Sequence, residues 1–259
     1  TILFWIASII FWGVSLVRLY QSYDMAPEIL KTMVWDGLDV DDQEGTLASE
    51  LQLEPYHSVE LRGAAKLYLN NGTQQSTILT TNQINSLVYE GAIKAEVRDS
   101  VLYIETSNQI PVDDVMIDFA ITSPNLRKLT VYGASKIETA DNQVLAQPNF
   151  TLDLNGAAEA DLHLNVQRLT VDAKGASKLE LEGQADDVHI MIAGAGEVEA
   201  EDLHVQTMHI NCAGASKAEV NVARELWAQA AGASKITYKG TPHIKQNMAV
   251  GGSVIKKEL

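Results

Sequence analysis

A short glycine-led motif recurs along the sequence at nearly fixed intervals. It reads Gly-Ala-Ser-Lys or a close variant, and the last copy reads Gly-Gly-Ser-Val. The copies begin at Gly133, Gly156, Gly175, Gly194, Gly214, Gly232 and Gly251. The intervals between these glycines are therefore 23, 19, 19, 20, 18 and 19 residues. A period this steady indicates a repeat architecture.

Apolar and polar residues alternate strictly between the copies. From Leu169 to Glu182, Leu, Val, Ala, Gly and Ser fall on one face, and mainly charged or polar residues fall on the other. Period two predicts a strand with one buried side. Helical solenoid repeats need about 33 residues or more, so a shorter repeat predicts one turn of a coil of short parallel strands. The predicted fold class is all-β, a right-handed single-stranded parallel β-helix (solenoid), since parallel crossovers are almost always right-handed.

Stacking of such turns, about 4.8 Å apart, places equivalent residues in columns. Alternation puts the motif glycines in one buried column and the residues two positions later in another. The members of that second column are Ser135, Ala158, Ser177, Gly196, Ser216 and Ser234. Both columns hold small residues only. We interpret them as a bend or narrow point where a larger side chain would overpack the core at a cost of about 1–3 kcal/mol.

Two outward columns carry charge. The residues three positions after each glycine are Lys136, Glu159, Lys178, Glu197, Lys217 and Lys235. The residues five positions after each glycine form an acidic ladder of Glu138, Asp161, Glu180, Glu199 and Glu219, followed by Thr237. Like charges that face each other directly repel, so the ladder needs compensation. We expect neighbouring lysines to supply it; a divalent cation on the ladder is the alternative, and no other cofactor is expected.

The charge and the single cysteine limit the classes of function. A formal net charge of −15 over 259 residues argues against nucleic acid as a partner. Cys212 has no partner for an intramolecular disulfide, and its parity places it on the buried face. We therefore expect it to be an inert core residue.

The amino-terminal stretch TILFWIASIIFWGVSLVRLY has no charge before Arg18. It predicts a transmembrane anchor helix over residues 1–20, with a removable signal sequence or a buried helix as alternatives. Residues 21–50 predict a short membrane-proximal helix and an acidic linker, and residues 51–259 the β-helix domain. The acidic linker and the β-rich body favour the exported side of the membrane, in the periplasm or at the cell surface.

The strand pattern is less regular between Glu54 and Thr130. Asp99-Ser100 separates two alternating runs as a hairpin turn does. We interpret this region as irregular early turns whose hairpins cover the open end of the coil. At the other end, Lys256, Lys257 and Glu258 place charge on the last strand, which protects an edge from edge-to-edge growth.

Four stretches together resemble the auto-transporter adhesin head domain, or GIN domain, of Bacteroidetes envelope proteins. They are YHSVELRGAAKLYL, EVRDSVLYIET, SPNLRKLTVYGASKIE and the serial motif copies. The resemblance covers about residues 51 to 255. It implies a right-handed β-helix exported to the cell envelope, and it implies no reaction.

Other β-helices act on polysaccharides, but their sites need acid, base or metal groups framed by long loops. Turns of 18–20 residues leave little room for such loops. The spacing predicts that His189 and His209 stack on the outer surface with Trp227 in the same column. We predict no catalytic, cofactor-binding or metal residue. A predicted partner surface consists of Tyr132, Trp227, Glu138, Asp161, Glu180, Glu199 and Glu219, whose aromatic members can stack on sugars or dock a protein.

The sequence thus predicts a non-catalytic, membrane-anchored envelope protein whose β-helix adheres, binds or scaffolds. Its expected partners are the membrane, through the amino-terminal helix, and an envelope protein or glycan; an oligomer is compatible with the same features. A polymer-forming scaffold similar to the bactofilins is one alternative. A polysaccharide-acting β-helix enzyme is the other.

Overall fold

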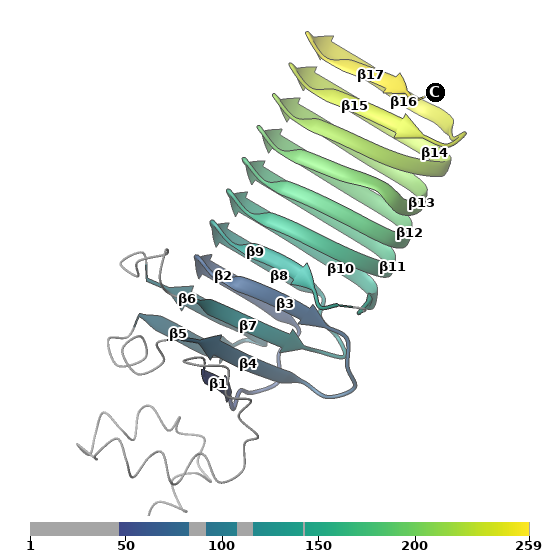
Figure 1. The fold of residues 1–259 in the computed structure, drawn as a ribbon. Coiled ribbons are helices and arrows are strands. Elements are labelled where there is room, and N and C mark those ends of the chain that lie inside the picture. Colours follow the sequence, from purple (N-terminus) through teal and green to yellow (C-terminus); the bar gives the residue numbers. More distant parts are fainter. Residues whose placement is uncertain (1–46, 83–91, 108–115, 142, 259) are drawn as a thin grey trace, which may run out of the picture.

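The computed structural model describes residues 47–82, 92–107, 116–141 and 143–258, and these form strands and turns but no helix. Figure 1 shows the strands stacked in turns along one axis. Their bounds are β1 (Leu47–Glu50), β2 (Ser58–Gly63), β3 (Lys66–Asn70), β4 (Ser76–Thr81), β5 (Ile93–Arg98), β6 (Val101–Thr106), β7 (Ile117–Thr122), β8 (Lys128–Gly133), β9 (Lys136–Thr139), β10 (Leu145–Gly156), β11 (Glu159–Gly175), β12 (Lys178–Gly194), β13 (Glu197–Gly214), β14 (Lys217–Gly232), β15 (Lys235–Lys239), β16 (His243–Gly251) and β17 (Val254–Lys257).

Each regular turn contains two straight segments and two bends. In β11 and β12, residues 159–166 pair in parallel with 178–185, and residues 168–175 pair with 187–194. The offset is 19 residues, so the predicted all-β solenoid and its period are confirmed. The segments that follow a glycine corner stack into one wall, called the first wall, and the segments that precede a glycine stack into the second wall. The right-handed sense stays a prediction from the crossover rule.

The glycine corners have a different cause from the predicted one. Gly175, Gly194, Gly214 and Gly232 are exposed, so these glycines do not lie in a buried column as predicted. Their φ angles lie between 80° and 124°, a region that L side chains rarely adopt. In addition, the carbonyl oxygen of Gly175 accepts a hydrogen bond from the Ala195 N–H, 2.8 Å away. A Cβ on Gly194 would lie against that oxygen, well inside van der Waals contact. The corner therefore requires glycine because of its backbone, not because of the core volume.

The column two residues after each glycine is buried, as predicted. Ser135, Ser177, Ser216 and Ser234 have exposed fractions of 2–6%. The Ser135 hydroxyl donates to the Gly63 carbonyl at 3.2 Å, and the Ser216 hydroxyl donates to Ser234 Oγ at 3.2 Å. Small hydroxyl side chains thus fill the corner and satisfy polar groups of neighbouring turns.

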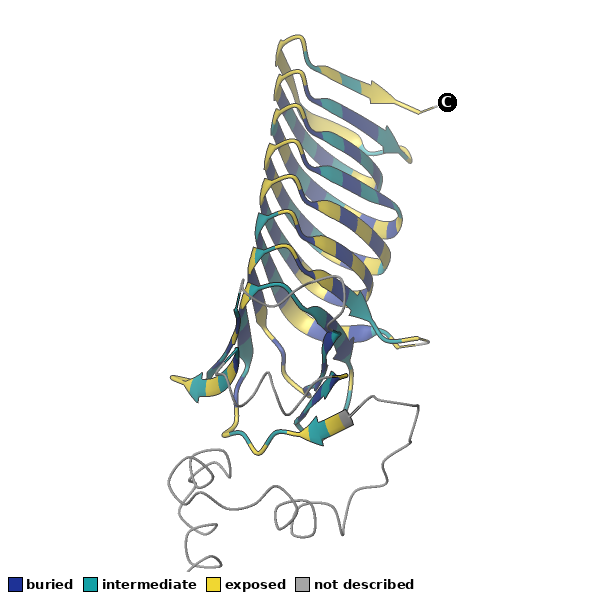
Figure 2. Ribbon diagram, turned by 60° about the vertical axis from the view of Figure 1, so that its left-hand side comes forward, coloured by how far each residue is buried: buried dark blue, intermediate teal, exposed yellow. Residues whose placement is uncertain are grey.

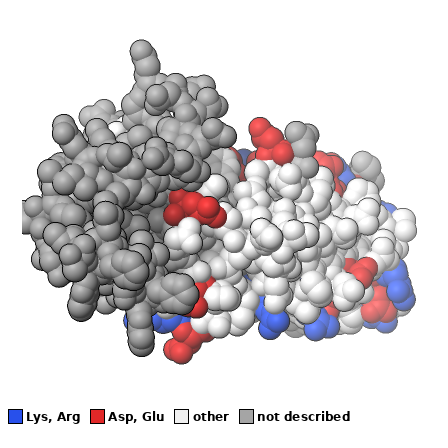
Figure 3. Space-filling model, turned by 90° about the horizontal axis from the view of Figure 1, so that it is seen from below, with Lys and Arg blue, Asp and Glu red and all other residues white. Residues whose placement is uncertain are grey.

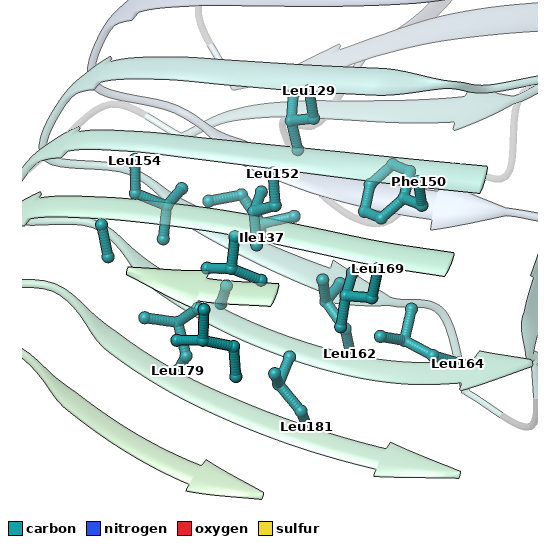
Figure 4. Packing of buried hydrophobic residues seen from close by; sticks show 14 of the residues in the cluster. Leu129, Ile137, Phe150, Leu152, Leu154, Leu162, Leu164, Leu169, Leu179 and Leu181 are labelled. Atoms are coloured by element: carbon teal, nitrogen blue, oxygen red, sulfur yellow. The ribbon is translucent and has the colours of Figure 1, made fainter. Parts of the chain in front are cut away.

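The core runs the whole length of the coil between the two walls. Figure 2 shows buried and exposed residues alternating along the strands. Figure 4 shows side chains of several turns meeting between the walls, among them Leu129, Leu152, Leu162 and Leu179. All four are completely buried. Cys212 is also completely buried, and burial raises the pKa of its thiol to about 11, which leaves it protonated at neutral pH.

The order of turns at the amino-terminal end differs from the order in the sequence. The β2–β3 turn lies between the β8–β9 turn and the β6–β7 turn, and it pairs in parallel with both. The predicted hairpin between β5 and β6 is confirmed, with φ angles of 50° at Asp99 and 61° at Ser100. Strands β1, β4 and β5 are antiparallel to their neighbours, so this end departs from a purely parallel coil.

The structure bears on one of the two predictions made for the amino-terminal segments. Strand β1 begins at Leu47, inside the segment predicted to be an acidic linker, because it pairs with β4 of the domain. The predicted anchor over 1–20 and the short helix after it lie outside the described residues. Within the part of the chain that the structure describes, no helix is long and apolar enough to cross a membrane.

Candidate functional site

The acidic ladder forms as predicted on the first wall. Asp161 lies opposite Glu138 on one side and Glu180 on the other, Glu199 follows Glu180, and Glu219 follows Glu199. Thr237 then lies opposite Glu219 and ends the acidic ladder. Each carboxylate is therefore one turn from the next, at about 4.8 Å between strands.

Lysines compensate three of the five carboxylates. Glu138 binds Lys66 at 2.9 Å and Lys136 at 2.6 Å. Partial burial pushes the pKa of Glu138 upward, but the hydrogen bonds from Lys136 and Lys66 outweigh it and lower the pKa below its ordinary value. Lys217 reaches Glu219 at 3.3 Å, and Lys178 reaches Glu199 at 3.7 Å.

The five carboxylates of the acidic ladder form a file along the solenoid rather than a cluster. Among the residues for which the structure gives positions, no group of three or more His, Cys, Asp or Glu side chains is arranged to hold a metal ion. The carboxylates lie in a straight file, whereas a calcium site gathers six to eight oxygens around one point. Lysines are thus the partners that the structure shows for Glu138, Glu199 and Glu219.

The predicted histidine and tryptophan column lies on the second wall. His189 and His209 are stacked, with ring centroids 4.5 Å apart and planes 4° from parallel. His209 and Trp227 continue the stack at 4.1 Å and 9°. His189 Nε2 also lies 3.3 Å from a carboxylate oxygen of Asp187. Burial, and then the neighbouring His189, lowers the pKa of His209 below its ordinary value.

The structure does not bring the two predicted surface aromatics together. Tyr132 and Trp227 both face outward on the second wall, but five turns separate them, about 24 Å along the solenoid axis. The Arg62 guanidinium lies 4.5 Å from the centroid of the Tyr132 ring, which covers one face of it. The acidic ladder lies on the other wall. The seven predicted partner residues therefore form separate features rather than one surface.

A surface that the sequence reasoning missed surrounds the histidine and tryptophan column. It consists of the residues one, three and five positions before Gly194, Gly214, Gly232 and Gly251, and we call it the uncharged face. Its members are Ala193, Met191, His189, Ala213, Asn211, His209, Ala231, Gln229, Trp227, Val250, Met248 and Gln246. Met191, Met248 and Val250 are 53%, 49% and 57% exposed.

The same positions on earlier turns are strongly charged. One, three and five residues before Gly63, Gly133, Gly156 and Gly175, half of the twelve residues carry a charge: Arg62, Glu60, Lys128, Asp153, Lys174 and Asp172. This difference in charge is visible in the sequence, because counting backward from each glycine gives many charged residues on the earlier turns and uncharged residues on the later turns. Figure 3 shows one face of the molecule with a broad area that is neither acidic nor basic.

A second missed feature is a groove of about 520 Å³ along the bend between the first wall and the second wall. Four successive turns line it. The lining residues are Ala146, Gln147, Pro148, Asn165, Val166, Gln167, Gln184, Ala185, Asp186, His204 and Gln206. Glutamine occupies this bend at Gln167 and Gln206, but Pro148 and Asp186 occupy it on the other two turns, so no regular sequence signal marked it.

The chain is similar to one known protein family and to several solved structures. The family described as "Putative auto-transporter adhesin, head GIN domain" matches residues 55–242. No curated protein gives a significant match.

Two similar solved structures illustrate the fold. A "putative adhesin" from Bacteroides fragilis NCTC 9343 is 20% identical with a TM-score of 0.72. A "putative lipid binding protein" from Parabacteroides distasonis ATCC 8503 is 17% identical with a TM-score of 0.64. Each match covers 84% of this chain and 98% of the other. The match over residues 55–242 and the stacked Gly-Ala-Ser-Lys corners agree, and the chain belongs to the auto-transporter adhesin head GIN domain family.

Proposed function

We propose that this protein is a non-catalytic, adhesin-like binding module of the bacterial cell envelope. In this proposal the segment 1–20 anchors the chain in a membrane, and the solenoid extends on the exported side. The uncharged face of the second wall is the binding surface. The adhesin names of the family and of the Bacteroides fragilis structure support this class of function.

The observation that carries the proposal is the absence of charge on twelve adjacent outward positions of the described second wall, in a chain of net charge −15. Charged side chains must be desolvated when a partner covers them, and like charges repel an acidic partner surface. A flat face of alanine, methionine, amide and stacked aromatic side chains carries neither cost. Methionine and tryptophan are also enriched at protein interfaces.

The size of the uncharged face suits weak contacts made by many copies. Four turns and three outward positions cover roughly 400 Å², from the strand spacing and the rise per residue. A stable complex buries about 800 Å² on each partner, so one copy is expected to bind weakly. Copies anchored side by side on a cell gain avidity without new contacts. This is the arrangement that adhesion requires.

A charge introduced on the uncharged face tests the proposal. Ala213→Glu places a carboxylate on one of its inner turns, in the column next to the glycine corner, and Asn155→Glu places one in the same outward column on the charged turns. Binding of the full chain to isolated cell envelopes is measured by sedimentation. We expect Ala213→Glu to weaken it at least tenfold and Asn155→Glu to leave it unchanged. Equal binding by both variants would reject the uncharged face as the binding surface.

A polymer-forming scaffold is a second candidate, favoured by the last described turn. There β16 pairs with β14, and β17 pairs with β15. Ile244 and Val254 are 36% and 48% exposed on this turn, so it offers apolar surface for end-to-end contact. Lys256 and Lys257 oppose such contact by charge. Filaments that lengthen with protein concentration in electron micrographs would support the scaffold; a monodisperse species at all concentrations would rule it out.

A further inference from the structure

The groove at the bend between the walls runs along the solenoid axis, because its lining residues come from four stacked turns. Ala146, Asn165, Gln184 and His204 lie in one outward column just before the bend. Pro148, Gln167, Asp186 and Gln206 lie at the bend itself. A ligand in this groove therefore crosses successive turns rather than following one strand.

Amide side chains dominate the lining. The exposed side chains of Asn165, Gln167, Gln184 and Gln206 each offer two N–H donors and a carbonyl acceptor. Asp186 is the only Asp, Glu, Lys or Arg among the lining residues. The groove thus combines both hydrogen-bonding roles with little charge, which suits a ligand rich in hydroxyl groups, since a hydroxyl also donates and accepts.

A buried amide at the end of the groove carries an unused donor. Gln147 is 5% exposed, and its Nε2 has no hydrogen-bond partner among the described residues. Its column continues with Val166, Ala185, Val205 and Val222, so every later turn places an apolar residue at the position of Gln147. Gln147 therefore faces the core, and its unpaired amide costs stability but takes no part in ligand binding.

The backbone of the groove disfavours an extended peptide as the ligand. Peptides that bind sheets add a strand to an edge with free N–H and C=O groups. The groove-lining segments of β11, β12 and β13 pair with the turns before and after them, and only residues 145–149 of β10, at one end of the groove, pair on one side alone among the described strands. No strand edge therefore runs along the groove. An acidic polymer is disfavoured because the chain carries a net charge of −15. An apolar ligand would leave the amides unpaired.

We propose that this groove binds a neutral oligosaccharide chain lying along the solenoid axis. The proposal rests on the adhesin-like function above and names one ligand class for it, at a site separate from the uncharged face. The exposed side-chain amides bind the sugar hydroxyls, and the small apolar residues Ala146 and Pro148 contact its C–H groups.

Isothermal titration with defined oligosaccharides tests this site. The full chain, kept in a zwitterionic detergent without a sugar headgroup, is titrated with linear β-glucan and α-mannan oligosaccharides and with oligogalacturonate. The groove variant is Gln184→Ala with Gln206→Ala, and its matched control is Asn71→Ala with Gln74→Ala in the exposed loop between β3 and β4, outside both the groove and the uncharged face. Gln184 and Gln206 are exposed, so folding is expected to be intact, and thermal unfolding verifies this.

We expect at least one neutral oligosaccharide to bind, oligogalacturonate to bind more weakly, and the groove variant to lose affinity about tenfold while the control keeps it. Equal affinity of the groove variant and the wild type would overturn the proposal. So would preferential binding of oligogalacturonate, or binding of unstructured peptides alone.

The envelope-binding assay separates this proposal from the proposed function. If neutral oligosaccharides do not bind while Ala213→Glu abolishes envelope binding, the groove proposal fails and the adhesin-like function stands. A second outcome is that the wild type binds neutral oligosaccharides, only the groove variant loses this affinity, and Ala213→Glu binds cell envelopes as the wild type does. In that case the groove proposal stands and the uncharged face is rejected as the binding surface.

Discussion

The indole of Trp227 lies on the imidazole of His209, with the ring centroids 4.1 Å apart and the planes 9° from parallel. Since His189 covers the other face of His209, the three side chains form one continuous stack. One face of the indole is thus already occupied. A sugar ring stacked flat on Trp227, as first expected, must compete for its other face, next to Gln246 of the following turn. The stack is better suited to be part of a flat docking surface.

Removing the indole should release the imidazole from its buried surroundings. Trp227→Ala exposes His209, whose pKa is lowered first by burial and then by His189. We expect the pKa of His209 to rise toward the ordinary value of 6.5, as followed by NMR titration of the ring protons. Tyr132→Ala, five turns away on the same wall, is the control and should leave it unchanged. No change in Trp227→Ala would contradict this origin of the shift.

The lowered pKa of His209 also determines whether the free energy of unfolding rises or falls with pH. Below the unfolded pKa, about 6.5, the unfolded chain binds a proton at His209 more readily than the folded chain does. The stability contribution of neutral His209 is therefore complete above that pH and is lost as pH falls through the folded pKa. The experiment is chemical unfolding between about pH 7.5 and 5.5, a range around the histidine pKa. We expect the free energy of unfolding of His209→Asn to change less with pH than that of the wild type.

The corner glycines should tolerate no side chain. At Gly194 a Cβ would meet the Gly175 carbonyl oxygen, and φ is 124°. We expect Gly194→Ala to lower the free energy of unfolding by about 3 kcal/mol. Gly252→Ala is the control, because its nearest neighbour would be 3.6 Å away and its φ is not in the left-handed region. Equal thermal midpoints for both variants would show that the corner backbone adapts.

The buried amide of Gln147 should cost stability. Gln147→Leu removes an unpartnered donor from the core, so we expect the free energy of unfolding to rise by about 1 kcal/mol. Thr237→Val removes the other unpartnered buried polar atom found among the described residues and should also stabilise the protein. Chemical unfolding measures both variants. In the oligosaccharide titration neither variant should change binding, because both side chains are buried; a loss of stability in Gln147→Leu would show that Gln147 has a structural partner.

Lysine compensation of the acidic ladder can be separated from cation binding. Lys217→Met removes the partner of Glu197 at 2.9 Å and of Glu219 at 3.3 Å. We expect a small decrease in thermal midpoint at low salt, because exposed ion pairs contribute little. Millimolar calcium should restore it in the variant and have no effect on the wild type. Lys235→Met, which has no acidic partner among the described residues, is the control. A calcium-dependent midpoint in the wild type would instead favour a cation on the acidic ladder.

Local sequence patterns were sufficient to predict the strands and the register of the regular turns. The 19-residue offset between Gly156 and Gly175 is the offset at which β10 and β11 pair. Likewise, His189 and His209 stack because both lie five residues before their glycine. The reason is that parallel strands without insertions keep one register, so a position in the repeat is also a position in space.

The early turns could not be ordered in the same way. Strand β2 pairs with both β6 and β8, although about 40 and 70 residues separate it from them, and no repeat interval relates them. The choice between such partners depends on how well the three turns pack together. The alternation in these strands indicated only that each has one buried side.

By itself, the sequence determined the fold class, the length of a turn, the walls on which side chains lie, and the hairpin at Asp99 and Ser100. Period-two alternation and a constant repeat translate directly into strands and columns. Only the tertiary structure decided why the corners need glycine, how the first turns are ordered, and where the groove lies. These depend on the approach of a carbonyl from the neighbouring turn and on a bend between Val166 and Arg168 at which no residue type occurs on every turn.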